Sequence, residues 1–169
     1  RNMLVSERTD PNSCNHKPYR NFFYRFAKVL VCQTKEAAES FPGYLKKKTV
    51  VIPNPVDSKG LPEVCRGERE KKVVSVGRLE YPKNQELLVE AFEEFYKKFP
   101  EYKLHFYGKG SKEKILREMA AAKHLEDAVV FHGFCADAAV QIADSAMFIL
   151  SSDYEGVSNS MAEAMAMGI

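Results

Sequence analysis

Apolar runs alternate with longer amphipathic stretches from Val73 to the end of the chain, and this alternation limits the fold more than any other feature. Strands that alternate with helices of about ten residues or more are typical of βαβ units, whose strands lie parallel and whose connections are right-handed. We therefore expect an α/β fold, with a parallel sheet and flanking helices. The expected strands are residues 73–76, 102–107, 128–131 and 146–150, and the expected helices are residues 84–99, 112–123, 137–143 and a final helix after Ser158.

The first third of the chain is predicted to belong to a separate domain. Its expected strands are residues 3–6, 29–32 and 49–52, and its expected helices are residues 18–28 and 34–41, the second closed by Pro42 and Gly43. Aromatic residues recur at helical spacing in the first of these helices, and we interpret them as core: Tyr19, Phe22, Phe23 and Phe26. Residues 53–57 break the pattern, and a polar, charged run continues the break. The predicted division is a domain at 1–57, a linker at 58–72 and a domain at 73–169.

The composition excludes several classes of protein. A net charge of +2, with no basic stripe interleaved with aromatic residues, does not indicate nucleic-acid binding. The four cysteines are scattered without a C-x-x-C pair, which fits a reducing cytosol and argues against a disulfide framework or a zinc site. No stretch is apolar enough over sufficient length to span a membrane. We interpret Lys46–Lys48 as a solvated edge, with contact to an anionic membrane surface as the alternative.

The most informative stretch follows the expected strand 146–150. Glu155 lies in a turn and Glu163 lies more than one turn inside the final helix, so both carboxylates can reach the carboxyl end of the strand, where parallel sheets bind ligands. Gly156 permits close approach of the backbone, and Ser158 is placed to cap the helix, whose free amides favour an anion. The alternative is that both glutamates are solvated charges. The Met/Ala-rich helix looks buried on most sides, and this favours a functional Glu163.

A second loop on the same edge carries positive charge. It runs from Gly77 to Asn84, with Arg78 able to grip a phosphate, Lys83 beside it, and Asn84 expected to cap the next helix. Ordinary surface charge explains Arg78 and Lys83 equally well from the residues alone.

The two remaining loops contain glycines. Gly108 and Gly110 form G-x-G, but Glu113 leaves the dinucleotide pattern G-x-G-x-x-G incomplete, so a tight turn is as good a reading as ligand contact. Gly133 follows the third strand, beside His132, which indicates nothing by itself.

Together these motifs resemble family 4 (group 1) retaining glycosyltransferases of the GT-B fold, in which two Rossmann-like domains face each other across a cleft. The resemblance lies in the E-x7-E spacing of Glu155 and Glu163, in G-R-L-x-x-x-K-N at residues 77–84, and in S-E-R-x-D-P at residues 6–11. The last motif is most similar to enzymes that transfer galactose-type or N-acetylgalactosamine units during bacterial surface polysaccharide assembly. By this resemblance the chain is a fragment: the end of an N-terminal acceptor domain and most of a donor-binding domain.

The resemblance also implies roles for the residues. Arg78 and Lys83 would neutralise the diphosphate of a nucleotide sugar, expected to be UDP-linked, and Glu155 would bind the donor sugar and Glu163 the ribose. The remaining donor-binding residues would be Gly77, Gly108, Gly110, Gly133, Gly156, Ser158 and Asn159. The acceptor would be a glycan or another lipid-linked acceptor, reached from the cytoplasm or at the inner face of the membrane. With no Asp-x-Asp motif, neither a metal nor another cofactor is expected.

Two other functions remain open at this point. One is a non-catalytic nucleotide-binding α/β domain. The other is half of a nicotinamide-dependent dehydrogenase, which the incomplete G-x-G-x-x-G argues against. The family's glycine-rich loop and last strand are not found in the chain, so we expect the 169 residues alone to be catalytically inactive.

Overall fold

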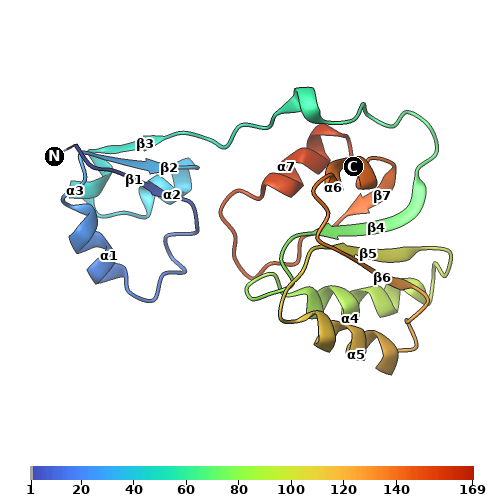
Figure 1. Cartoon of the computed structure of the whole chain (residues 1–169). Helices are drawn as coiled ribbons and strands as arrows, with labels where there is room; N and C mark the ends of the chain where they lie inside the picture. The colour runs from blue at the N-terminus through green and yellow to red at the C-terminus, as the bar shows by residue number, and fades with distance from the viewer. Residues whose placement is uncertain (1) are drawn as a thin grey trace. The chain divides into compact units, whose positions relative to one another are not determined.

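The computed structural model describes residues 2–169 and contains two compact units, each built on a parallel sheet (Figure 1). The N-terminal unit comprises residues 1–55 together with 154–158, and the C-terminal unit comprises residues 56–153 and 159–169. The expected α/β class, with parallel sheets and flanking helices, is confirmed.

The N-terminal unit has three strands in the order β1-β2-β3, all parallel. Its elements are β1 (Leu4–Glu7), α1 (Lys17–Tyr24), β2 (Val29–Cys32), α2 (Lys35–Glu39), α3 (Gly43–Lys46) and β3 (Thr49–Val51). Its small core consists of Leu30, Cys32, Phe41 and Leu45. Thr34 begins α2, because its hydroxyl accepts a hydrogen bond from the amide of Ala37 at 3.1 Å.

The helix expected before Pro42 is present and ends at Glu39, but the sequence did not predict α3, which begins at Gly43 with Pro42 as its N-cap residue and a buried Leu45. The expectation that the aromatic residues of this region are core is wrong. Three of them lie in α1 and the fourth just after it, and they are 50–70% exposed: Tyr19, Phe22, Phe23 and Phe26. Helical spacing put them on one face, as predicted, but that face points to the surface.

The C-terminal unit has four parallel strands in the order β6-β5-β4-β7. Its elements are η1 (Ser58–Gly60), β4 (Glu70–Val76), α4 (Gln85–Tyr96), β5 (Lys103–Tyr107), α5 (Glu113–Ala122), β6 (Val129–Gly133), α6 (Ala138–Ile142), β7 (Ser145–Phe148) and α7 (Asn159–Ala166). The predicted bounds agree within about three residues. The largest differences are three residues each: β4 begins at Glu70 rather than Val73, and α4 ends at Tyr96 rather than Phe99.

Helices cover both faces of this sheet (Figure 1). Because side chains alternate along a strand, Leu104 and Phe106 pack with α4 and α5 on one face. Val74 and Tyr107 point to the other face, where they pack with Ile142 of α6. This arrangement leaves the loops after the strands along one edge.

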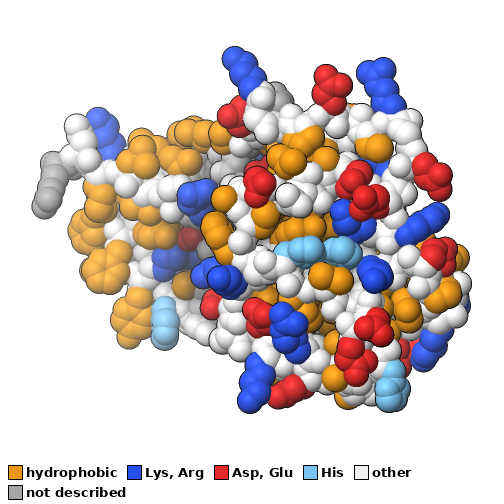
Figure 2. All heavy atoms as spheres, turned by 45° about the vertical axis from the view of Figure 1, so that its right-hand side comes forward, with side chains coloured by type: hydrophobic (Ala, Val, Ile, Leu, Met, Phe, Trp, Pro, Cys, Tyr) orange, Lys and Arg blue, Asp and Glu red, His pale blue; other side chains and the backbone are white. Residues whose placement is uncertain are grey.

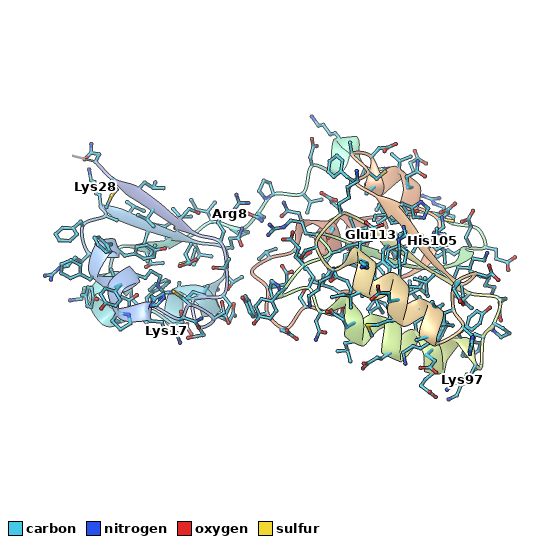
Figure 3. All side chains as sticks on the ribbon, turned by 60° about the horizontal axis from the view of Figure 1, so that its bottom comes forward. Arg8, Lys17, Lys28, Lys97, His105 and Glu113 are labelled. Atoms are coloured by element: carbon cyan, nitrogen blue, oxygen red, sulfur yellow. The ribbon has the colours of Figure 1, made fainter. Side chains whose placement is uncertain are left out.

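A histidine pair lies on the second face of the sheet. His105, labelled in Figure 3, lies on β5. Its Nδ1 is 2.9 Å from His132 Nε2 on β6, and the His132 ring stacks on Tyr107 with centroids 4.2 Å apart. Burial, followed by the neighbouring His132, lowers the pKa of His105 to about 4. Burial also lowers the pKa of His132. At neutral pH the pair is therefore uncharged, one ring donating to the other.

This pair predicts a pH dependence of stability. The folded-state pKa of His105 lies below its ordinary value of 6.5, so the unfolded chain takes up this proton more readily. The stabilising contribution is complete above pH 6.5 and is lost as the pH falls towards 4. We expect a His105→Gln variant to lose less stability than the parent between pH 7 and pH 5, as measured by urea unfolding. Equal losses in the two proteins would contradict this assignment.

Candidate functional site: the loops at the strand ends

The strand order creates a switch point between β4 and β7. The chain builds outward from β4 to β5 and β6, and then returns to place β7 on the other side of β4. Ligands of open α/β sheets bind in the crevice outside the carboxyl ends of two such strands. Residues 77–84, here called the basic loop, follow β4 at this point, and residues 149–153 follow β7.

The basic loop is fixed through its own carbonyl groups. Arg78 O accepts from Gln85 Nε2 at 2.8 Å, and Gln85 is only 2% exposed. Leu79 O accepts from the amide of Lys112 at 3.0 Å. These bonds come from the starts of α4 and α5, so the two helices hold the backbone that carries Arg78.

The segment after β7 fixes the other end of the basic loop. The amide of Asp153 donates to Pro82 O at 2.9 Å, and Ser151 Oγ donates to Lys83 O at 3.0 Å. Asn84 Nδ2 donates to Asp153 Oδ1 at 2.6 Å. Asn84 sits at the N-cap position of α4 with φ 48°, but within residues 2–169 its side chain makes no capping bond, so the predicted cap is wrong. The side chain joins the two loops at the switch point instead.

The two basic side chains of the loop are placed differently. The Arg78 side chain is 79% exposed, with its guanidinium 3.7 Å from Glu80. Lys83 extends over Gly77: its Cε would be 3.5 Å, and its Nζ 3.8 Å, from a Cβ at that position. Lys83 is therefore held against the end of β4, whereas Arg78 projects into solvent.

The glycines of the neighbouring loops serve the packing of the loops. A Cβ on Gly108 would lie 1.9 Å from Gly77 O, and one on Gly110 would lie 2.1 Å from Leu79 O. Gly133 has φ +71° and its carbonyl accepts from the amide of Gly108 at 2.7 Å. The tight-turn reading of Gly108 and Gly110 is thus supported by a steric reason, while their predicted contact with a donor stays a prediction.

The start of α7 adjoins the end of β4. Ser160 Oγ donates to Val76 O at 3.1 Å, one residue before the basic loop. Asn159 begins the helix and is exposed, Ser158 before it is 6% exposed, and Glu163 is half-buried. The expectation that α7 is buried on most sides is wrong, because Ala164 is its only buried residue within 159–166. Burial therefore gives less support to a functional Glu163 than the sequence indicated.

Glu155 and Gly156 group with the N-terminal unit. A Cβ on Gly156 would lie 2.2 Å from Arg8 O, and the amide of Val157 donates to Gln33 Oε1 at 3.3 Å. Both residues line a cavity of about 200 Å³, whose other polar lining residues include Glu7, Thr9, Asp10, Asn12, Gln33, Thr34 and Glu36. The predicted site residues thus divide between the units: Glu155, Gly156 and Ser158 in one, and the basic loop, the other glycines, Asn159 and Glu163 in the other.

Sequence reasoning missed the residues that hold the basic loop. Gln85, Ser151 and Asp153 act through bonds to backbone atoms up to 71 positions away, for which a single sequence gives no signal. Over residues 2–169, no group of three His, Cys, Asp or Glu side chains is arranged to hold a metal ion. The same residues contain no helix whose length and apolar character would suit a membrane crossing.

The role of Gln85 predicts a loss of stability. Replacing it with leucine removes the donor to Arg78 O and leaves a part-buried carbonyl without its bond, which costs about 1–3 kcal/mol. We expect Gln85→Leu to lower the free energy of unfolding by this amount in urea titrations. An unchanged midpoint would show that Gln85 does not hold the loop.

The match to a known protein family covers the region that contains the basic loop and α7. A family model described as "Glycosyl transferases group 1" matches residues 62–169, more than half of the chain. An uncharacterized glycosyltransferase of Methanocaldococcus jannaschii is 27% identical over 161 residues, covering 88% of this chain and 40% of the relative. The GtfA subunit of the UDP-N-acetylglucosamine–peptide N-acetylglucosaminyltransferase of Streptococcus pneumoniae is 26% identical over 138 residues, covering 81% of this chain and 27% of the relative.

Solved structures share the fold. Pneumococcal O-GlcNAc transferase GtfA, in complex with UDP and GlcNAc, matches 99% of this chain with a TM-score of 0.85 and 21% identity. HepE of Anabaena, in complex with UDP, matches 99% with a TM-score of 0.82 and 20% identity. The chain covers 36% of the first structure and 52% of the second. With the family model across residues 62–169, the chain belongs to the group 1 family of glycosyl transferases.

Proposed function

We propose that the whole protein is a retaining glycosyltransferase that moves a hexose or N-acetylhexosamine from a UDP-linked donor to a glycan or lipid-linked acceptor. The observation that carries this proposal is the fixed basic loop at the switch point, beside the start of α7. The UDP in the two structures of the same fold supports the choice of donor. Surface polysaccharide synthesis, at the inner face of the membrane, is the proposed setting.

The proposed reaction breaks the bond between the anomeric carbon of the donor sugar and the β-phosphate oxygen. The acceptor hydroxyl forms the new bond on the same face, and its proton passes to the departing phosphate. Arg78 and Lys83 stabilise the charge that develops on the diphosphate. Glu155 accepts hydrogen bonds from donor-sugar hydroxyls, and the amides near Gly156 and Asn159 bind oxygen anions.

The proposed donor site includes Glu163 as the acceptor for the ribose hydroxyls. Its side chain lies on α7, whose start is bonded to the end of β4. No metal is required in this proposal, because the cations that neutralise the diphosphate are side chains of the chain itself. We also propose that the 169 residues alone do not turn over donor.

Calorimetric titration tests the donor assignment directly. We expect UDP to bind, and GDP, ADP and NAD to bind at least tenfold more weakly. Glu163→Ala should weaken UDP binding by about tenfold or more, because a hydrogen bond to a charged group contributes about 1.5–3 kcal/mol. Glu118→Ala, on the exposed side of α5, is the matched control. Absence of UDP binding by the folded, full-length protein would overturn the proposal, as would equal binding by Glu163→Ala.

A further inference from the structure

We propose that Arg69 is a positioning residue of the donor site: it holds the end of α7 and thereby sets where Glu163 meets the ribose of the nucleotide. The inference rests on the proposed function, because it takes the ribose as the partner of Glu163. Arg69 directly precedes β4, whereas the basic loop follows that strand, which is seven residues long. Seven residues of strand span about 20 Å, so Arg69 acts on the site through other residues and not by touching the donor.

Arg69 is distinguished by its hydrogen bonds. Figure 2 shows Lys and Arg side chains interspersed with Asp and Glu over the face of the C-terminal unit that it presents, so a basic side chain on this unit is not notable by itself. The guanidinium of Arg69, however, donates to main-chain carbonyls of two separate regions. Its Nη1 donates to Ala143 O at 3.2 Å and to Ser145 O at 3.0 Å. Its Nη2 donates to Met167 O at 3.3 Å and to Gly168 O at 3.0 Å. One side chain therefore joins the end of α6 and the start of β7 to the end of α7.

The end of α7 leaves main-chain carbonyls that need a donor. The helix closes in a Schellman arrangement: Gly168 has φ +74°, and the amides of Gly168 and Ile169 donate back into the last turn at 3.1 and 3.0 Å. The carbonyls of Met167 and Gly168 lie beyond these closing bonds, and Arg69 supplies their donor. The helix dipole also favours a cation at this end. Arg69 thus completes the end of α7.

Contacts at both ends fix α7 against β4. At its start, Ser160 Oγ donates to Val76 O at the last residue of β4. Near its end, Met167 is fully buried in the core on this face of the sheet, and Arg69 holds its carbonyl. Glu163 lies between these ties, one turn before Met167, whose amide donates to Glu163 O at 3.0 Å. The position of the Glu163 carboxylate therefore depends on the tie at each end, and releasing Arg69 lets the last turn of the helix move.

The expected effect on binding is specific to the ribose. A carboxylate that accepts hydrogen bonds from the ribose hydroxyls discriminates UDP from 2′,3′-dideoxy-UDP, which lacks both hydroxyls. Because Arg69 acts through Glu163 in this proposal, its loss should reduce this preference and leave the affinity for the dideoxy ligand nearly unchanged. A residue that only stabilises the fold would change the two affinities by the same factor.

Calorimetric titration of the full-length protein with UDP and 2′,3′-dideoxy-UDP tests the proposal. We expect the parent to prefer UDP by about tenfold or more, Glu163→Ala to abolish the preference, and Arg69→Met to reduce it by about threefold or more. Added to Glu163→Ala, Arg69→Met should not weaken UDP binding further. Ser160→Ala, which releases the other end of α7, should also reduce the preference. The matched control is Arg66→Met, which changes an exposed arginine of the same segment and should bind both ligands as the parent does.

The outcomes separate the roles of Arg69 and Glu163. If Arg69→Met does not fold, Arg69→Lys replaces it, because lysine keeps the charge but lacks the planar fork that reaches several carbonyls. An unchanged preference in a folded Arg69 variant overturns the proposal, as does a further loss of UDP affinity when Arg69→Met is added to Glu163→Ala. A parent that binds the two ligands equally would overturn the ribose role of Glu163 and with it this inference. A parent that binds neither would instead overturn the proposed function.

Discussion

Under the proposed function, Lys83→Ala is expected to lower kcat of the full-length protein by about 10²–10³-fold. The reason is electrostatic: a cation preorganised at the leaving diphosphate stabilises charge that appears only in the transition state, and removing one such group typically costs this factor. In the structure the Lys83 side chain lies across Gly77, and its carbonyl accepts a hydrogen bond from Ser151 Oγ at 3.0 Å. Because the Arg78 side chain is 79% exposed and less fixed than Lys83, we expect Arg78→Ala to lower kcat by a smaller factor.

Initial-rate kinetics distinguish the possible outcomes for Lys83. A loss confined to kcat means stabilisation of the transition state, whereas a rise in KM at constant kcat means that Lys83 only binds the donor. Lys114→Ala is the matched control, because this lysine is 87% exposed on α5 and pairs weakly with Glu118 at 3.9 Å. Lys83→Ala with unchanged melting and full activity would remove Lys83 from the catalytic set.

The fold was predictable because the spacing of apolar residues along the chain indicates which side chains are buried. The strands of the C-terminal unit have apolar residues that enter two cores, and the sequence located all four of them. The direction of a helix face was not predictable in the same way. The spacing of Phe22 and Phe26 shows that they share a face, but that face points outward because Arg20 and Tyr24 meet Glu7.

In the candidate site, too, one part was predictable from the sequence and another was not. Loops after parallel strands meet at one edge, so the neighbourhood of the basic loop and the loop after β7 follows from topology. The partner of Asn84 could not be predicted. Asparagine is suited to capping a helix, but here its side chain donates to Asp153, which is far away in sequence on the other side of the switch point. Likewise, G-x-G at residues 108–110 gives no indication of whether a ligand or a neighbouring carbonyl occupies the space.

At Gly108 the position that a Cβ would take is occupied by the carbonyl of Gly77. A substitution that adds a single methyl group there should therefore reduce stability strongly. In Gly108→Ala the new Cβ would lie 1.9 Å from Gly77 O and 2.8 Å from Gly77 C, both backbone atoms, at a φ of +152°. Either the pairing of Gly77 with Tyr107, an amide-to-carbonyl bond of 2.9 Å, must break or the basic loop must move. We expect a loss of about 3 kcal/mol or more in the free energy of unfolding, at the upper end of overpacking costs.

The same displacement should reach the proposed donor site. Because Gly77 underlies the Lys83 side chain, moving its carbonyl shifts the cation, and we expect UDP affinity to fall together with stability. Gly67→Ala is the matched control, since a Cβ there has no atom within 4 Å among the described residues. Urea unfolding and UDP titration of both variants provide the test. If Gly108→Ala were as stable as Gly67→Ala, the close approach of the two loops would not be what requires glycine at position 108, and ligand contact would become the better explanation.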